Sequence, residues 1–207
     1  MQPKHAGILG FLLGCTVTCM ATYGAYLYVM DEVRVHATSS DWTPDYERLL
    51  LEASAQLEAA TTDEDRWLAL TDAALWNVDA GMLELAEEQA WEAWELSERF
   101  PETSVRYDQA HSVLIVIGRI ALRKGEIDQA VLNLLRAGQV SGGPATSSFG
   151  PNMLLAKELL DIGESVAVLE YLELCGQFWD MGQKRLALWS KQISDGEAPD
   201  FGANLIY

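Results

Sequence analysis

Residues able to act as a base, a nucleophile or a metal ligand are few in this sequence and lie far apart. The histidines are His5, His36 and His111, and Cys175 has no histidine close to it along the chain. A catalytic or metal site needs several such groups held in one place. None of the spacings typical of zinc hydrolases (HExxH), serine hydrolases (GxSxG), cysteine pairs (CxxC) or EF-hands occurs. We therefore expect no enzyme activity and no metal or cofactor, with Cys175 an inert packing thiol.

Carboxylates are the remaining groups that could do chemistry, and they gather in one part of the chain. Residues 41–108 hold 18 Asp and Glu against four Arg, a net charge of −14 out of −17 for the whole protein. Adjacent acids such as Glu87 and Glu88 are more typical of a solvated helix face than of a catalytic pair. A field of this sign repels phosphate backbones, so nucleic acid is not an expected partner. A basic protein or peptide surface is compatible with it.

Four residues in this acidic region are candidates for partner binding. Glu84, Glu88, Trp91 and Glu95 recur at helical spacing. Tryptophan beside carboxylates can bind a basic, partly apolar protein face. The alternative is a solubilising surface, with tryptophans in the core as aromatic residues at helical spacing usually are. The sequence leaves both interpretations open.

The elements expected to carry these residues are helix hairpins, most clearly at residues 114–137. This stretch reads as two helices around a turn at Gly125, with small residues where two helices must come close. The spacing resembles the tetratricopeptide repeat, a helix–turn–helix unit of about 34 residues. Such a unit cannot bury its apolar face alone, so the resemblance implies stacked neighbours and a scaffold role without ligand chemistry.

Two further stretches align with this unit. In the first, Gly81 takes the place of the turn glycine, and Ala86 and Ala93 take the places of two helix-contact alanines. A looser unit at residues 152–178 turns at Gly163. The C-terminal part is also similar to uncharacterised bacterial repeat proteins. The predicted helix-contact positions are Ala86, Ala93, Gly118, Ala130 and Ala137.

A loop is expected between the second and third units, and a capping helix and a tail are expected after the third. Residues 141–150 are rich in turn formers and lack a phosphate-binding ending. Residues 184–193 predict an amphipathic helix that covers the end of the stack. Residues 149–153 (FGPNM) and 201–205 (FGANL) echo each other. They read either as a pair of surface docking elements or as two similar turns, with Asn152 capping the next helix.

The N-terminal segment is expected to span a membrane. Residues 6–30 carry no charge and are long enough to cross a bilayer. A cleaved signal peptide, or lipidation at Cys15, is the alternative. Lys4 before the segment and acids after it favour a cytoplasmic N-terminus and an extracytoplasmic domain. Small residues predicted to pack against other membrane helices are Gly7, Gly10, Gly14, Ala21 and Gly24.

The sequence thus predicts an all-α protein: a single transmembrane helix, then a short α-solenoid of tetratricopeptide-like hairpins with a C-terminal capping helix. Thr43 is expected to cap the first helix of the domain, with Pro44 at its first position. The predicted parts are an anchor (1–32), a linker (33–41), a helical repeat domain (42–195) and a tail (196–207). The expected function is a membrane-anchored interaction scaffold, most simply an accessory or assembly subunit of a bacterial membrane complex. The alternative is a stand-alone tethered adaptor that binds a peptide or a soluble partner in its repeat groove. Its expected partners are membrane lipid and either other membrane subunits or a basic protein surface.

Overall fold

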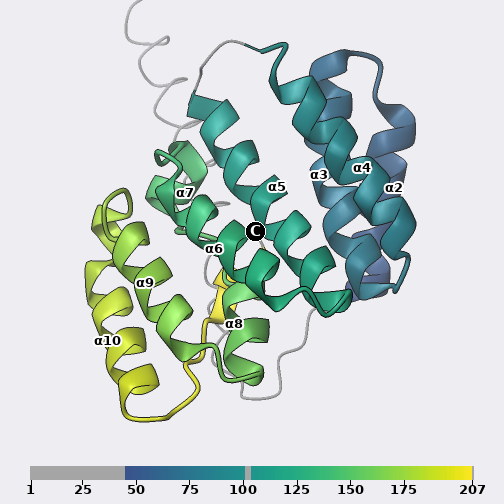
Figure 1. Ribbon diagram of the computed structural model, residues 1–207. Coiled ribbons are helices and arrows are strands. Elements are labelled where there is room, and N and C mark those ends of the chain that lie inside the picture. Colours follow the sequence, from purple (N-terminus) through teal and green to yellow (C-terminus); the bar gives the residue numbers. More distant parts are fainter. Residues whose placement is uncertain (1–44, 101–103, 207) are drawn as a thin grey trace, which may run out of the picture. The chain divides into compact units, whose positions relative to one another are not determined.

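All of the regular structure in the computed structural model, which describes residues 45–100 and 104–206, is helical (Figure 1). These described residues contain no strand, so the all-α prediction is confirmed. The α-helices are α2 (Tyr46–Ala59), α3 (Asp63–Asp79), α4 (Leu83–Ser97), α5 (Ser104–Arg123), α6 (Ile127–Gln139), α7 (Pro144–Ser148), α8 (Leu154–Asp161), α9 (Ser165–Cys175) and α10 (Gln183–Ser194). Two short 3₁₀ helices, η1 (Asp180–Gly182) and η2 (Gly202–Leu205), complete them.

The predicted membrane anchor and linker lie outside the described residues, and with them Gly7, Gly10, Gly14, Ala21 and Gly24. In the part of the chain that the structure does describe, no helix is both long and apolar enough to cross a bilayer. The described residues all belong to one compact unit, Pro44–Tyr207.

The same glycine turn ends α3, α5 and α8. Gly81, Gly125 and Gly163 have φ angles of 74°, 79° and 95°, a left-handed conformation that glycine adopts without steric cost. At each turn the next residue's N–H donates, at 2.9 Å, to the carbonyl oxygen five residues earlier. This pattern satisfies carbonyl groups that the helix end leaves without partners. The chain therefore reverses in the same way before α4, α6 and α9.

These turns produce three helix hairpins that lie side by side. The hairpins are α3–α4, α5–α6 and α8–α9. Their first helices are neighbours, since α5 packs on both α3 and α8. Their second helices pack on the following hairpin, α4 on α5 and α6 on α9, while α2 covers α3 and α10 covers α9 (Figure 1).

The small residues predicted at helix contacts lie in the interior. The side chains of Ala86, Ala93, Ala130 and Ala137 have no exposed surface. Gly118 on α5 faces α8 so closely that a Cβ atom there would clash with the Leu155 side chain. Their assignment as equivalent positions of one repeat stays a prediction.

Two local expectations are wrong. The first domain helix starts at Tyr46, after the N-cap Asp45, whose side chain accepts the backbone N–H of Arg48, instead of starting after Thr43. Residues 141–150 are not a plain loop, because they contain α7. Asp108 on α5 accepts the backbone N–H groups of Ala145 and Thr146 at the start of α7. That long-range contact is not visible in the local sequence.

The C-terminal tail packs into the core. Phe201 is buried edge-on against the Trp189 ring, whose Nε1 donates to the carbonyl oxygen of Asp200. Asn204 is fully buried, and its Nδ2 donates to the carbonyl oxygens of Phe149 and Pro151 at 3.2 and 3.0 Å. The tail is therefore bonded to the segment that precedes α8.

Candidate partner-binding groove

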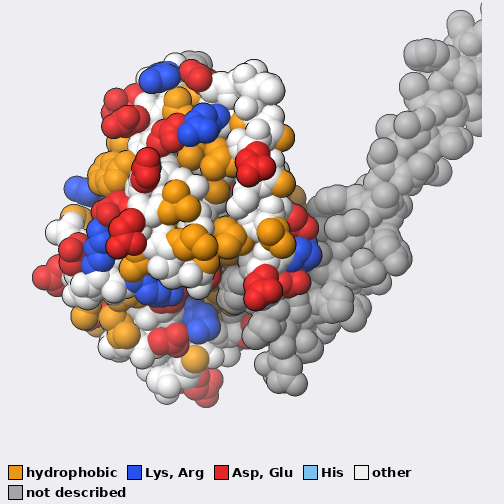
Figure 2. Space-filling view, turned by 90° about the vertical axis from the view of Figure 1, so that its right-hand side faces the viewer, with side chains coloured by type: hydrophobic (Ala, Val, Ile, Leu, Met, Phe, Trp, Pro, Cys, Tyr) orange, Lys and Arg blue, Asp and Glu red, His pale blue; other side chains and the backbone are white. Residues whose placement is uncertain are grey.

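The four candidate binding residues all lie on α4. Its opposite face is a row of alanines buried against α3 and α5, so the acidic side must point outward. Glu84, Glu88 and Glu95 are exposed, and Trp91 is 50% exposed. The side of the molecule that carries α2–α4 shows a band of hydrophobic side chains with Asp and Glu at its borders (Figure 2).

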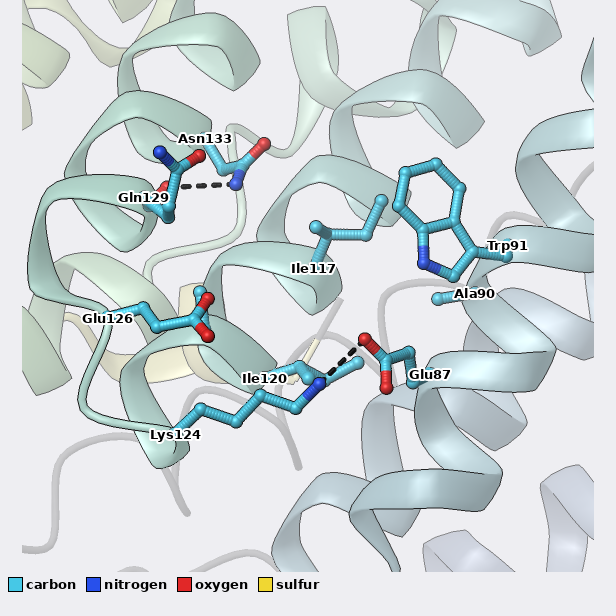
Figure 3. Close-up of a pocket in the computed structure, with 10 residues that line it drawn as sticks. Glu87, Ala90, Trp91, Ile117, Ile120, Lys124, Glu126, Gln129 and Asn133 are labelled. Atoms are coloured by element: carbon cyan, nitrogen blue, oxygen red, sulfur yellow. Dashed lines mark hydrogen bonds and ion pairs between the residues drawn. The ribbon is translucent and has the colours of Figure 1, made fainter.

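A groove lies next to this face, with α4 and α6 as its walls and α5 as its floor (Figure 3). Its volume is about 180 Å³. Of the four predicted residues only Trp91 lines it among the described side chains; the three glutamates lie elsewhere on α4. The lining residues are Glu87, Ala90 and Trp91 from α4, Ile117, Ile120, Ala121 and Lys124 from α5 and its end, and Glu126, Gln129 and Asn133 from α6 and its start.

The floor of the groove is apolar and its rim is polar. Ile120 and Ala121 are buried, and Ile117 is partly exposed. On the α6 wall, Asn133 Nδ2 donates to the backbone oxygen of Gln129 at 2.8 Å, which fixes the amide. The arrangement resembles the centre of a protein interface, where an apolar contact is surrounded by polar groups.

The charges on the rim are unevenly matched. Lys124 Nζ lies 2.7 Å from Glu87 Oε1 and bridges α5 to α4. The hydrogen bond to Glu87 raises the pKa of Lys124, and the fields of Glu126 and Glu84 add to this effect. The Glu126 carboxylate points into the groove (Figure 3) and forms no ion pair within the described residues. The groove thus carries one uncompensated negative charge.

A buried ion cluster between α3, α5 and α8 is a feature that was not predicted from the sequence. Arg119 on α5 is 1% exposed, and its Nη2 lies 2.6 Å from Asp79 Oδ1 on α3 and 2.7 Å from Glu158 Oε1 on α8. Its Nη1 also donates to the carbonyl oxygen of Leu75. The cluster joins the first helices of all three hairpins. The available signal was an arginine inside the apolar run IVIGRIAL, because such a charge must find buried partners.

Opposing effects set the pKa values in this cluster. Burial disfavours the charged guanidinium of Arg119, but the Glu158 and Asp79 carboxylates outweigh it and raise the pKa. Burial also disfavours the Glu158 carboxylate, but Arg119 and then Arg123 hold the pKa of Glu158 below its usual value. Arg119 and Glu158 are therefore both ionised at neutral pH, and the cluster is a structural clamp.

His111 and Cys175, the histidine and the cysteine of the described residues, both lie against the same buried tyrosine, Tyr171. A carbonyl oxygen can only accept, so neutral His111 carries its proton on Nδ1 and donates to Ala137, 3.0 Å away. The Tyr171 hydroxyl lies 3.2 Å from His111 Nε2 and donates to the Asn152 carbonyl oxygen at 2.9 Å. The network ties α5, α6 and α9 together.

Burial keeps both residues uncharged. It lowers the pKa of His111 to about 4, against the weaker effect of its bond to Ala137. It raises the pKa of the Cys175 thiol, against a weaker opposing effect of the neighbouring Tyr171 hydroxyl group. A thiol held protonated in this way is a poor nucleophile. His5 and His36, the other two histidines, lie outside the described residues.

Within the described ranges, 45–100 and 104–206, no three His, Cys, Asp or Glu side chains are grouped so that they could hold a metal ion. The strongest candidate site in this region is therefore the groove between α4 and α6. Comparison of the chain with protein-family models, with curated proteins and with solved structures found no match.

Proposed function

We propose that the protein is a membrane-anchored interaction scaffold, an accessory or assembly subunit of a bacterial membrane protein complex. The proposal rests chiefly on one observation: half-exposed Trp91 borders an apolar groove whose rim carries an unmatched carboxylate. Tryptophan is among the side chains that contribute most to protein interfaces. The surrounding acidic face of α4 fits a partner with a basic, partly apolar surface.

The architecture that we propose is a short tetratricopeptide-like solenoid. The recurring turn at Gly81, Gly125 and Gly163 supports this proposal, as do the buried small residues of the hairpins. Hairpins of this kind stack and present extended surfaces, and α10 would cap the last of them.

The membrane anchor belongs to the proposal on the grounds of sequence. The uncharged residues 6–30 would span the bilayer, with the N-terminus cytoplasmic and the helical domain extracytoplasmic. The glycines of this segment would pack against membrane helices of the partner subunits. In the second candidate function, the protein is a stand-alone tethered adaptor that binds a peptide or a soluble partner in its repeat groove.

Extraction in mild detergent followed by size measurement tests the proposal and separates the two candidates. A subunit should co-purify with other membrane proteins in fixed ratio, whereas an adaptor should run alone or as a small oligomer. Gly14→Leu should release a subunit from its complex while leaving it in the membrane. If no membrane proteins co-purify, the subunit proposal is wrong.

The role of the acidic face has its own test. Reversal of Glu84, Glu88 and Glu95 to lysine should weaken partner association, most at low salt, where screening of exposed charges is least. If the charge-reversed variant and the unaltered protein bind the partner equally well at every salt concentration, this face serves only to keep the protein soluble.

A further inference from the structure

We infer that the groove between α4 and α6 receives one arginine side chain of the partner. The inference rests on the proposed scaffold function and names the chemistry that the groove would recognise. It follows from the size of the groove, the position of Trp91 and the unmatched charge of Glu126.

The size of the groove fits a single side chain. Its volume of about 180 Å³ is below the roughly 300–1,000 Å³ of small-molecule and cofactor sites. Trp91, Lys124 and Glu126 at its rim are exposed, so the groove is open to the surface. A long side chain could therefore enter from a partner that lies across α4 and α6.

The lining suits the two parts of an arginine. Ile117, Ile120 and Ala121 form an apolar floor on which the aliphatic stem can lie. The Trp91 indole stands on the wall opposite Glu126 (Figure 3). A guanidinium group stacks on an indole face and pairs with a carboxylate, and it is more weakly hydrated than the lysine ammonium. Arginine is therefore favoured over lysine.

The charge at the rim favours a cation over an anion. Lys124 is engaged by Glu87 at 2.7 Å, so it is not available to bind a carboxylate without losing that contact. Of the two carboxylates that line the groove, Glu87 and Glu126, only Glu126 has no ion-pair partner among the described residues. Entry of one guanidinium group would bring the groove to charge balance.

The chain contains a matched control for Glu126. Glu126 and Glu164 both follow a left-handed glycine, both precede a helix (α6 and α9), and neither side chain caps its helix. Glu164 does not line the groove. Replacing either glutamate by glutamine changes the same charge in the same local structure, so a difference between the two variants reports the groove itself.

The test uses the full-length protein in detergent micelles, labelled with 5-fluorotryptophan and followed by ¹⁹F NMR. The Trp91 signal is assigned with Trp91→Phe. The probes are N-acetyl-arginine N-methylamide and its uncharged citrulline analogue, both at millimolar concentrations. We expect the arginine probe to shift the Trp91 signal saturably and the citrulline probe to leave it unchanged. Glu126→Gln should weaken binding roughly five-fold, as expected for loss of one partly exposed ion pair, and Glu164→Gln should not.

Three results would overturn the inference: no shift with the arginine probe, equal shifts with both probes, or equal effects of Glu126→Gln and Glu164→Gln. Failure here is separable from failure of the proposed function. If membrane partners co-purify but the arginine probe does not shift the Trp91 signal, the groove inference alone is wrong. If Trp91 responds selectively but no partner co-purifies, the groove binds arginine and the subunit proposal fails.

Discussion

Replacing Arg119 with methionine should destabilise the protein strongly, because Met fills similar space without the charge. The substitution removes the two contacts of Arg119 Nη2, at 2.6 Å to Asp79 and 2.7 Å to Glu158. It also removes the hydrogen bond to the Leu75 carbonyl oxygen. Asp79 and Glu158 are only 15% and 16% exposed, so water restores little of the lost solvation. Breaking a buried ion pair by removing one partner typically costs about 3–5 kcal/mol.

Arg123→Met is the matched control, because both arginines bind the same carboxylate. Arg123 Nη2 lies 2.6 Å from Glu158 Oε1, but its side chain is 36% exposed. Partly solvated ion pairs contribute about 0–1 kcal/mol. For a folded unit of this size each kcal/mol shifts the melting temperature by roughly 2–4 °C. We therefore expect Arg119→Met to lower the melting temperature by roughly 6–20 °C and Arg123→Met by only a few degrees.

The pH dependence of the Arg119→Met effect tests its cause. The pKa of Glu158 is lower in the folded protein than its ordinary value of 4.5. The ionised carboxylate therefore stabilises the fold fully above pH 4.5, and this stabilisation is lost as the pH falls through the pKa of Glu158 in the folded protein. Arg119→Met removes the charge that lowers the pKa of Glu158 most. The difference in unfolding free energy between the variant and the unaltered protein should therefore shrink from pH 7 to pH 3, as measured by urea denaturation. A difference that is absent at pH 7, or that stays constant with pH, would refute the ionic clamp.

Three further predictions concern other buried positions. Asn204→Ala should cost about 1–3 kcal/mol in urea denaturation, because the carbonyl oxygens that Asn204 serves lose their donor; an unchanged midpoint would mean that the tail does not stabilise the fold. Burial lowers the pKa of His111 to about 4 in the folded protein, so the unfolded chain takes up the proton first and the free energy of unfolding decreases as the pH falls from 7 to 5. His111→Gln should remove about 2 kcal/mol of that decrease. Equal pH profiles of the variant and the unaltered protein would contradict this. Ala130→Leu should lower the free energy of unfolding by about 1–3 kcal/mol through overpacking at a fully buried site. An unchanged melting temperature would show that the neighbouring helices move apart without cost.

The features predicted correctly from the sequence depend on residues close together in the chain. The all-α class follows from helical periodicity. The turns at Gly81, Gly125 and Gly163 follow from glycine between two apolar patterns.

The features that were missed depend on contacts between distant residues. Arg119 is separated from its two carboxylate partners by 40 and 39 positions. The groove brings together α4, α5 and α6, and it includes Lys124 and Glu126, which look like ordinary turn residues in the sequence. Helical spacing indicated the exposed stripe of α4. It could not indicate the groove, because the spacing of residues in one helix does not show which side chains of other helices lie beside it.

The two Phe-Gly-x-Asn stretches show how one pattern can carry two different physical roles. Asn152 acts locally, because its Oδ1 accepts the backbone N–H of Leu154 at the first residue of α8. Asn204 acts at long range through the loop carbonyls, and Arg185 donates to its Oδ1 at 3.1 Å.

The two stretches also bond directly, since the N–H of Met153 donates to the Asn204 carbonyl oxygen at 2.8 Å. The interpretation as two exposed docking elements is wrong for the tail, because Phe201 is only 3% exposed. A carbonyl-rich turn before α8 needs donors, and a buried amide can provide two of them. The tail provides that amide and at the same time covers Trp189, so it is part of the folded unit and not an appendage to it.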